Sequence, residues 1–162
     1  MALYYFDTSA LVKYYVTEPG STWVRRLLDE RDAGTGHFQH VILIAEITRV
    51  EVAAGLAVIE RAGRIRRSER DRAYTHFLSQ LIHRYAVIPL TTDDLEAAAN
   101  LTQRRPLRAY DAVQLATALR YRRLLAAYPL VFVCGDNTLM TAAQAEGLST
   151  VNPFDHIAPE DQ

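Results

Sequence analysis

Four acidic side chains stand in chain segments that are otherwise apolar or small, a setting that suggests metal chemistry. Asp7 follows an aromatic run, Asp136 follows the most hydrophobic run, and Glu51 and Asp111 lie among small or apolar neighbours. Carboxylates about 5 Å apart repel each other by about 3 kcal/mol at an effective dielectric of about 20, so a bound cation would stabilise such a cluster. Oxygen ligands select Mg²⁺ or Mn²⁺ over zinc, and Mg²⁺ commonly bridges to phosphate. The pattern therefore predicts metal-dependent hydrolysis of phosphodiester bonds.

Each of these acids also has an ordinary structural explanation, which the sequence leaves open. Asp7 and Asp136 each precede the start of a helix and are also typical turn or capping residues. The alternative for Glu51 is a salt bridge to an arginine elsewhere in the chain, because an unpaired buried carboxylate is costly. The alternative for Asp111 is an acid that caps a helix or stabilises its first turn.

Other catalytic chemistries lack the residues that they need. The histidines show no H-E-x-x-H spacing, no serine stands in a G-x-S-x-G elbow, and neither a P-loop nor a G-x-G-x-x-G motif is present. Cys134 is the single cysteine, which excludes an intrachain disulfide, and its place at the end of an apolar run is typical of an inert core thiol. A phosphotransferase with Asp7 as nucleophile is disfavoured because Ser9 occupies the position of the expected second acid.

The elements that must position the acids alternate between short strands and helices. Strands are expected at residues 3–6, 41–45, 86–90, 130–134 and 149–151. Helices are expected between them, including a long helix from Ser68 to about Tyr85. This alternation predicts an α/β fold with a central, mostly parallel sheet of about five short strands and helices on both faces. Ligands bind beyond the carboxyl ends of the strands in such sheets, which is where Asp7 and Asp136 fall.

The composition is that of one globular domain. The chain has 162 residues, 49% of them hydrophobic and 23% charged, with a net charge of −1. No apolar run approaches the ~20 residues of a membrane span. The first residues lack the basic segment of a signal peptide, so a cytoplasmic location is expected. We expect a single domain at 1–154 and a short acidic C-terminal tail at 155–162.

The basic residues are clustered, and all but Lys13 are arginines. The clusters are the stretch Arg61–Arg72, the group Arg104, Arg105 and Arg108, and the group Arg120, Arg122 and Arg123. Arginine makes forked contacts with phosphate, and the second group lies just before Asp111, so we expect it to contact phosphates that flank the cleaved bond. The first stretch also contains acidic residues and has a solvated helix face as its alternative.

Together, the segments around the four acids resemble those of the PIN-domain ribonucleases, and most closely the VapC-type toxins of prokaryotic toxin–antitoxin pairs. The matching stretches are FDTSALVK at 6–13, ITRVEVAAGL at 47–56, YDAVQLATAL at 110–119 and VCGDNTLMTAAQAEGL at 133–148. The resemblance spans essentially the whole chain and implies a PIN-like three-layer fold. It implies that the four acids hold Mg²⁺ or Mn²⁺ and that Thr8 and Ser9 assist beside the first of them. Cys134 and Gly135 depart from the usual residues at that point, and Asn137 is an additional polar candidate.

The resemblance further implies an Mg²⁺-dependent endoribonuclease whose products carry a 5′-phosphate and a 3′-hydroxyl. It implies a homodimer that is silenced by a VapB-like antitoxin, whose C-terminal segment can place a basic side chain in the acidic pocket. The alternative function is a non-catalytic PIN-like module that binds RNA or the basic tail of a partner.

Overall fold

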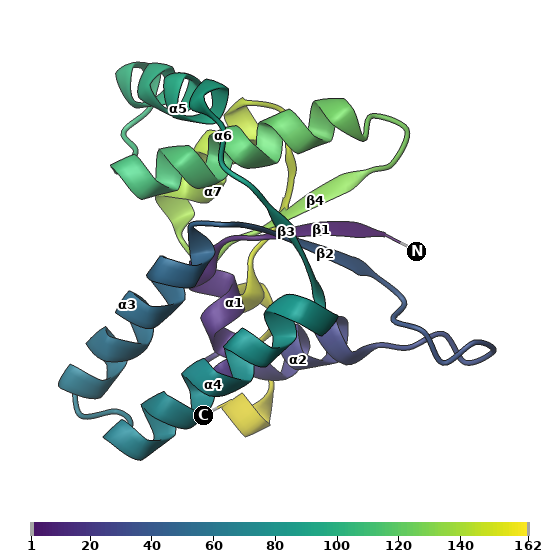
Figure 1. The fold of residues 1–162 in the computed structure, drawn as a ribbon, viewed down its shortest axis with the longest axis vertical. Coiled ribbons are helices and arrows are strands. Elements are labelled where there is room, and N and C mark those ends of the chain that lie inside the picture. The colour runs from purple at the N-terminus through teal and green to yellow at the C-terminus, as the bar shows by residue number, and fades with distance from the viewer. Residues whose placement is uncertain (1, 162) are drawn as a thin grey trace.

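A five-stranded sheet forms the centre of the molecule, as the computed structural model, which describes residues 2–161, shows (Figure 1). The strands are β1 (Leu3–Phe6), β2 (Val41–Ala45), β3 (Tyr85–Ile88), β4 (Leu130–Val133) and β5 (Ser149–Val151). They lie in the order β3-β2-β1-β4-β5, and each neighbouring pair is parallel. The predicted α/β class and strand number are confirmed.

Helices cover both faces of this sheet and complete the three layers (Figure 1). One layer holds α1 (Thr8–Tyr15), α2 (Ser21–Asp29), α3 (Thr48–Arg61) and α4 (Arg67–His83). The opposite layer holds α5 (Thr92–Arg104), α6 (Ala109–Leu124) and α7 (Asn137–Ala145). Each strand is followed by a helix or a short 3₁₀ turn, so every helix that follows a strand begins at the carboxyl edge of the sheet.

Two hydrophobic cores separate the layers, and successive strand residues enter them alternately. In β1, Tyr5 packs toward α5, α6 and α7, whereas Phe6 packs toward the other helices, and both side chains are fully buried. In β4, Phe132 and Val133 repeat the alternation. A sheet that is covered on both faces explains why the inner strands β1, β2 and β4 are almost entirely apolar or aromatic.

The long helix α4 ends earlier than the sequence predicts. It runs to His83, and Tyr85 begins β3 instead of closing the helix. Between them lies the buried Arg84, whose Nε donates a 2.8 Å hydrogen bond to the backbone carbonyl of Leu28 at the end of α2. The helix therefore ends where a long-range contact fixes Arg84, which local propensity does not reveal.

The C-terminal segment packs against the start of α2. Two 3₁₀ turns follow β5, η1 (Pro153–His156) and η2 (Pro159–Asp161). The Asp161 carboxylate accepts hydrogen bonds from the backbone N–H of Gly20 at 3.0 Å and from the N–H and hydroxyl of Thr22, each at 2.8 Å. Burial raises the pKa of Asp161, but the hydrogen bonds outweigh it and lower the pKa to about 2. Gly20 has φ of +90°, and a Cβ there would lie 2.4 Å from the carbonyl oxygen of Pro153, so only glycine fits.

Candidate active site

The carboxyl ends of β1 and β4 bring the first and last of the four acids together. Phe6 and Val133 are register partners in these adjacent strands, and the backbone N–H of Asp7 donates to the carbonyl of Val133 at 2.9 Å. Asp136 follows β4 after a two-residue turn. Glu51 and Asp111 come from the first turns of α3 and α6. All four line one cavity of about 340 Å³ (the acidic cavity), which is also lined by Thr8, Ser9, Val50, Ala54, Arg108 and Tyr110.

Asp7 serves as the N-cap of α1 through one of its two carboxylate oxygens, Oδ2. Its Oδ2 accepts hydrogen bonds from the Ser9 backbone N–H at 2.9 Å and from the Ser9 hydroxyl at 2.5 Å. The Ser9 hydroxyl in turn accepts from the N–H of Gly135 at 2.9 Å, which ties the β4 turn to α1. Both of the Ser9 bonds go to Oδ2, and a further backbone hydrogen bond from Thr8 to the carboxylate helps to lower its pKa. Burial raises the pKa of Asp7, and the charge of Asp136 adds to the rise.

Glu51 is held by two donors, neither of which is an arginine. The Thr8 hydroxyl at 2.9 Å and the Gln114 Nε2 at 2.5 Å both donate to its Oε2. Burial raises the pKa of Glu51, the charges of Asp7 and Asp111 add to the rise, and the two hydrogen bonds oppose it. In the described part of the chain Glu51 makes no ion pair, so the arginine alternative for this acid is wrong.

Gln114 is the residue of this site that sequence reasoning missed. Its side chain is fully buried, and its Oε1 accepts a 2.7 Å hydrogen bond from the hydroxyl of Tyr5. That bond orients the amide so that Nε2 donates to Glu51 and, at 3.0 Å, to the Thr48 hydroxyl. The available signal was its spacing: Gln114 lies three residues after Asp111, on the same helix face, as a lone polar residue in an apolar run.

Asp111 and Asp136 complete the acidic cavity from the α6 and α7 side. Burial raises the pKa of Asp111, as do the charges of Asp7 and Asp136, while the nearby Arg108 guanidinium partly opposes the rise. Asp136 is exposed and caps α7, with its Oδ1 accepting from the N–H of Leu139 at 2.8 Å. Asp136 therefore combines its predicted capping role with a place among the four acids.

Asn137 lies outside the acidic cavity, unlike Thr8 and Ser9. Its side chain accepts a 3.2 Å hydrogen bond from the amide of Asn152, and it lines a separate cavity together with Arg104 and Arg105. The expected group of polar residues around the acids is thus brought together only in part. Gln114 stands in the supporting position for which Asn137 was the candidate.

The second arginine cluster is divided between two places. Arg108 lines the acidic cavity, whereas Arg104 and Arg105 pair with Glu146 at 3.5 and 3.0 Å. In the third cluster, Arg120 pairs with Asp94 at 2.7 Å. Only Arg108 is therefore placed to meet a phosphate directly at the acids.

Several arginines of the stretch from 61 to 72 make ion pairs on or near the surface. Arg64 pairs with Glu18 at 2.8 Å, and Arg70 pairs with Glu60 at 2.5 Å and with Asp71 at 2.7 Å. These contacts agree with the solvated, charge-balanced helix face that the sequence offered as an alternative for this stretch.

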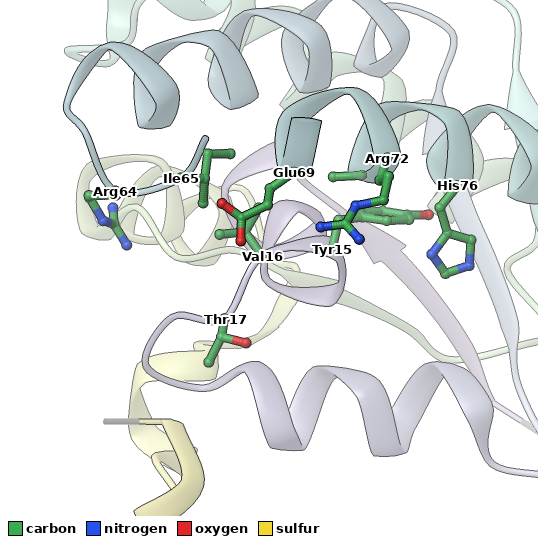
Figure 2. Close-up of a pocket in the computed structure, with 9 residues that line it drawn as sticks. Tyr15, Val16, Thr17, Arg64, Ile65, Glu69, Arg72 and His76 are labelled. Atoms are coloured by element: carbon green, nitrogen blue, oxygen red, sulfur yellow. The ribbon is translucent and has the colours of Figure 1, made fainter. Parts of the chain in front are cut away.

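A larger cavity, of about 560 Å³, lies away from the acids, between the end of α1 and α4 (Figure 2). Glu69, Arg72 and His76 line it from α4 and Tyr15 from α1. Acidic and basic side chains mix there, and no group of carboxylates forms as it does at the sheet edge. Size alone therefore does not mark the catalytic centre.

The acidic cavity fits a divalent cation held largely through water. The groups that could bind a cation are carboxylates, and the charge of each contributes to raising the pKa of its neighbours. A cation between them would reverse this effect and lower those pKa values. No group of three or more His, Cys, Asp and Glu in residues 2–161 is arranged to hold a metal ion by itself. Mg²⁺ is commonly bound by only one or two carboxylates and keeps several waters, which suits this arrangement.

Comparisons with known proteins match most of the chain to one family. Residues 4–128 match the PIN domain family. Ribonuclease VapC47 of Mycobacterium tuberculosis is 30% identical over 149 residues, covering 92% of this chain and 96% of the relative. Ribonuclease VapC49 of the same species is 33% identical over 150 residues, covering 91% and 93%.

Solved structures show the same fold at lower sequence identity. PAE2754 from Pyrobaculum aerophilum has a TM-score of 0.61 at 18% identity, covering 96% of this chain and 91% of its own. A chain of VapBC2 from Rickettsia felis, bound to a DNA fragment from its promoter, has a TM-score of 0.60 at 14% identity, covering 93% and 98%. None of the helices in residues 2–161 has the length and apolar character that crossing a membrane requires. With the family match, the curated relatives and the fold in agreement, this chain belongs to the PIN-domain family, in its VapC-type branch.

Proposed function

We propose that this protein is a divalent-metal-dependent endoribonuclease that acts as the toxin of a toxin–antitoxin pair. The observation that carries the proposal is the acidic cavity, in which carboxylates from four separate chain segments meet beside one arginine. The family supports it, because the curated relatives are named VapC ribonucleases. We expect the enzyme to act in the cytoplasm, where its RNA substrate is found.

Mg²⁺ or Mn²⁺ is the proposed cofactor, with Asp7 and Asp111 as the principal ligands and Glu51 and Asp136 completing the site. The raised pKa of Asp111 supports this assignment, because burial and then the charges of Asp7 and Asp136 leave this carboxylate in need of a positive partner. A bound cation would supply a water of lowered pKa and would offset the charge that develops on the phosphate.

The side chains around the cation site orient the reaction. Thr8 and Gln114 both engage Oε2 of Glu51, so its Oε1 is left to hold and align the attacking water. Attack on phosphorus by that water, with loss of the 3′ oxygen as a hydroxyl, gives a 5′-phosphate and a 3′-hydroxyl. Arg108, at the wall of the same cavity, is placed to hold a phosphate oxygen of the RNA. Ser9 keeps Asp7 from rotating, through its two hydrogen bonds to Oδ2.

A VapB-like antitoxin is the proposed partner, and the chain is proposed to act as a homodimer. A basic side chain from such a partner would offset part of the charge of the four carboxylates in place of the metal ion, which would explain inhibition by charge alone. One structural neighbour is a VapBC pair on promoter DNA, and another is a toxin–antitoxin complex from Klebsiella pneumoniae.

Digestion of a panel of structured RNAs tests the proposal. Wild type should cleave in Mg²⁺ or Mn²⁺ and lose cleavage in EDTA, and its products should carry 5′-phosphates. Asp7→Asn should lower the rate by at least about 100-fold, which is about 2.7 kcal/mol of transition-state stabilisation, with an unchanged circular dichroism spectrum. Asp93→Asn, an exposed acid in the first turn of α5, is the matched control and should cleave like wild type. Binding of RNA without cleavage under any metal condition would favour the non-catalytic binding module instead.

A further inference from the structure

A second cavity of about 400 Å³ lies next to the acidic cavity. One of its walls is the outer face of α7, and the other is the segment Arg104–Pro106 between α5 and α6. Both walls continue into the acidic cavity, because Asn137 directly follows Asp136 and Arg108 comes two residues after Pro106. A polymer that binds across the four acids would therefore also contact this second cavity.

The lining of the second cavity combines small apolar surfaces with free polar groups. Pro106, Ala142 and Ala145 give it apolar surface without large side chains. The carbonyl of the Asn137 side chain is engaged by Asn152, which leaves its amide N–H groups without an acceptor among residues 2–161. A flat apolar surface with hydrogen-bonding groups at its margin suits an unstacked base.

The charge at the mouth of this cavity is positive. Arg104 and Arg105 share one carboxylate, that of Glu146, at 3.5 and 3.0 Å. Arg122 is not one of the lining residues, and it donates to the backbone carbonyls of Glu146 and Gly147. The two guanidinium groups of Arg104 and Arg105 face one carboxylate, so the remaining positive charge favours a phosphate at the mouth. A nucleotide would thus meet a phosphate-attracting rim and a base-sized interior.

We propose that the cavity between α7 and Arg104–Pro106 binds the nucleobase next to the cleaved phosphodiester and makes cleavage selective for that base. The proposal rests on the proposed ribonuclease function and adds a determinant of RNA sequence selectivity to it. Contacts to phosphate position a nucleic acid but do not read its sequence, so selectivity needs a site of this kind.

Filling the cavity tests the proposal. Ala145→Leu projects extra bulk from the exposed face of α7 without touching any of the four acids. On a single-stranded RNA library, wild type should prefer certain bases at one position next to the cut. Ala145→Leu should lower that preference by about tenfold, the scale of discrimination that an apolar pocket gives. Ala99→Leu, at an exposed alanine of α5 outside both cavities, should keep the wild-type preference.

A binding measurement separates this proposal from the ribonuclease function. The methyl resonances of Ala142 and Ala145 are followed by NMR in Asp7→Asn protein while an RNA hexamer is added. The proposal expects both methyls to shift, and it expects Ala145→Leu to weaken hexamer binding by about fivefold or more, the scale set by base contacts in single-strand sites.

The outcomes are distinct. Shifts confined to Val50 and Ala54 of the acidic cavity, or a wild-type preference retained by Ala145→Leu, overturn the base-binding cavity and leave the ribonuclease function intact. If wild type cleaves no RNA but the hexamer still shifts Ala142 and Ala145, catalysis is refuted and base binding stands.

Discussion

Replacing Gln114 should both destabilise the fold and slow the reaction, because this amide joins the core to the acidic cavity. Its Oε1 accepts from the Tyr5 hydroxyl and its Nε2 donates to Thr48 and Glu51. Gln114→Leu keeps the approximate volume and removes these bonds. Glu51 then loses one of the two donors that fix it, and cleavage should fall by about 100-fold, as for a misplaced catalytic group.

The size of the stability change follows from which groups lose their partners. Tyr5 and Thr48 are both fully buried, and a buried polar group without a partner costs about 1–3 kcal/mol. Two such groups give about 2–6 kcal/mol for Gln114→Leu. Tyr5→Phe leaves only the Oε1 of Gln114 without its donor and should cost about 1–2 kcal/mol. In Gln114→Leu the Thr117 hydroxyl beside Tyr5 can replace part of the lost bond, which favours the lower half of that range.

A double-mutant cycle measures the bond directly. Urea unfolding of wild type, Tyr5→Phe, Gln114→Leu and the double variant at pH 7 in EDTA gives the four free energies. In the Gln114→Leu background the phenol no longer has its acceptor, so removing it should cost almost nothing and the coupling should be about 1 kcal/mol or more. Gln103→Leu, at an exposed glutamine of α5, should change stability by less than about 0.5 kcal/mol. Single effects that add to within about 0.5 kcal/mol would refute the proposed role of this amide.

Three further predictions concern charge. Burial and the neighbouring acids raise the pKa of Asp111, so the folded chain holds a proton that the unfolded chain has released. The free energy of unfolding in EDTA should therefore fall as pH rises from about 4 through the raised pKa of the folded state. In urea titrations, Asp111→Asn should flatten this fall and Mg²⁺ should reverse it. An unchanged slope of the free energy against pH in the variant would contradict the reasoning. Arg108→Gln should reduce the slope of log RNA affinity against log salt by about 1. Arg120→Gln breaks an ion pair, so it should lower stability and leave this slope unchanged. Equal slopes in both variants would argue against phosphate contact by Arg108. Asp161→Asn should lower the melting temperature at pH 7, and the difference should shrink as pH falls from about 4 toward 2, because the folded state keeps this carboxylate ionised to low pH; a difference that does not depend on pH would count against the hydrogen bonds to its charge.

The parts of the fold that the sequence predicts are those that depend on the pattern of neighbouring residues. The strands Leu3–Phe6 and Val41–Ala45 have the predicted bounds, because an apolar run marks each of them. The convergence of Asp7 and Asp136 was also predictable, since parallel strands end at one edge of a sheet.

The parts that could not be predicted depend on contacts between distant segments. The end of α4 depends on Arg84 reaching α2, and the packing of the C-terminal turns depends on Asp161 reaching Gly20 across the chain. The role of Gln114 depends on Tyr5, which is 109 positions away, so only the fold reveals it. The pairing of Arg104 and Arg105 with Glu146 is of the same kind, and it divides a cluster that looks uniform in the sequence.

The capping and catalytic explanations of the acids turn out to be compatible, because all four acids lie at helix N-termini. Asp7 and Asp136 cap α1 and α7, and Glu51 and Asp111 lie in the first turns of α3 and α6. A helix N-terminus favours a nearby negative charge by about 0.3–1 kcal/mol, so four of them offset about 1–4 kcal/mol of repulsion. A single pair of carboxylates about 5 Å apart already repels by about 3 kcal/mol at an effective dielectric of about 20.

The helix ends therefore offset part of the repulsion within the cluster without neutralising its charge. The unfavourable free energy that is left shows in the raised pKa values of Asp7, Glu51 and Asp111. Burial is the first cause of each rise, and a neighbouring carboxylate contributes to each. A cation satisfies both causes at once, since it supplies the opposite charge and brings its own water into a poorly solvated cavity. A basic side chain from a partner supplies only the opposite charge and brings no activated water. The same four carboxylates can thus favour a metal ion for catalysis and accept an inhibitor's arginine or lysine in its absence.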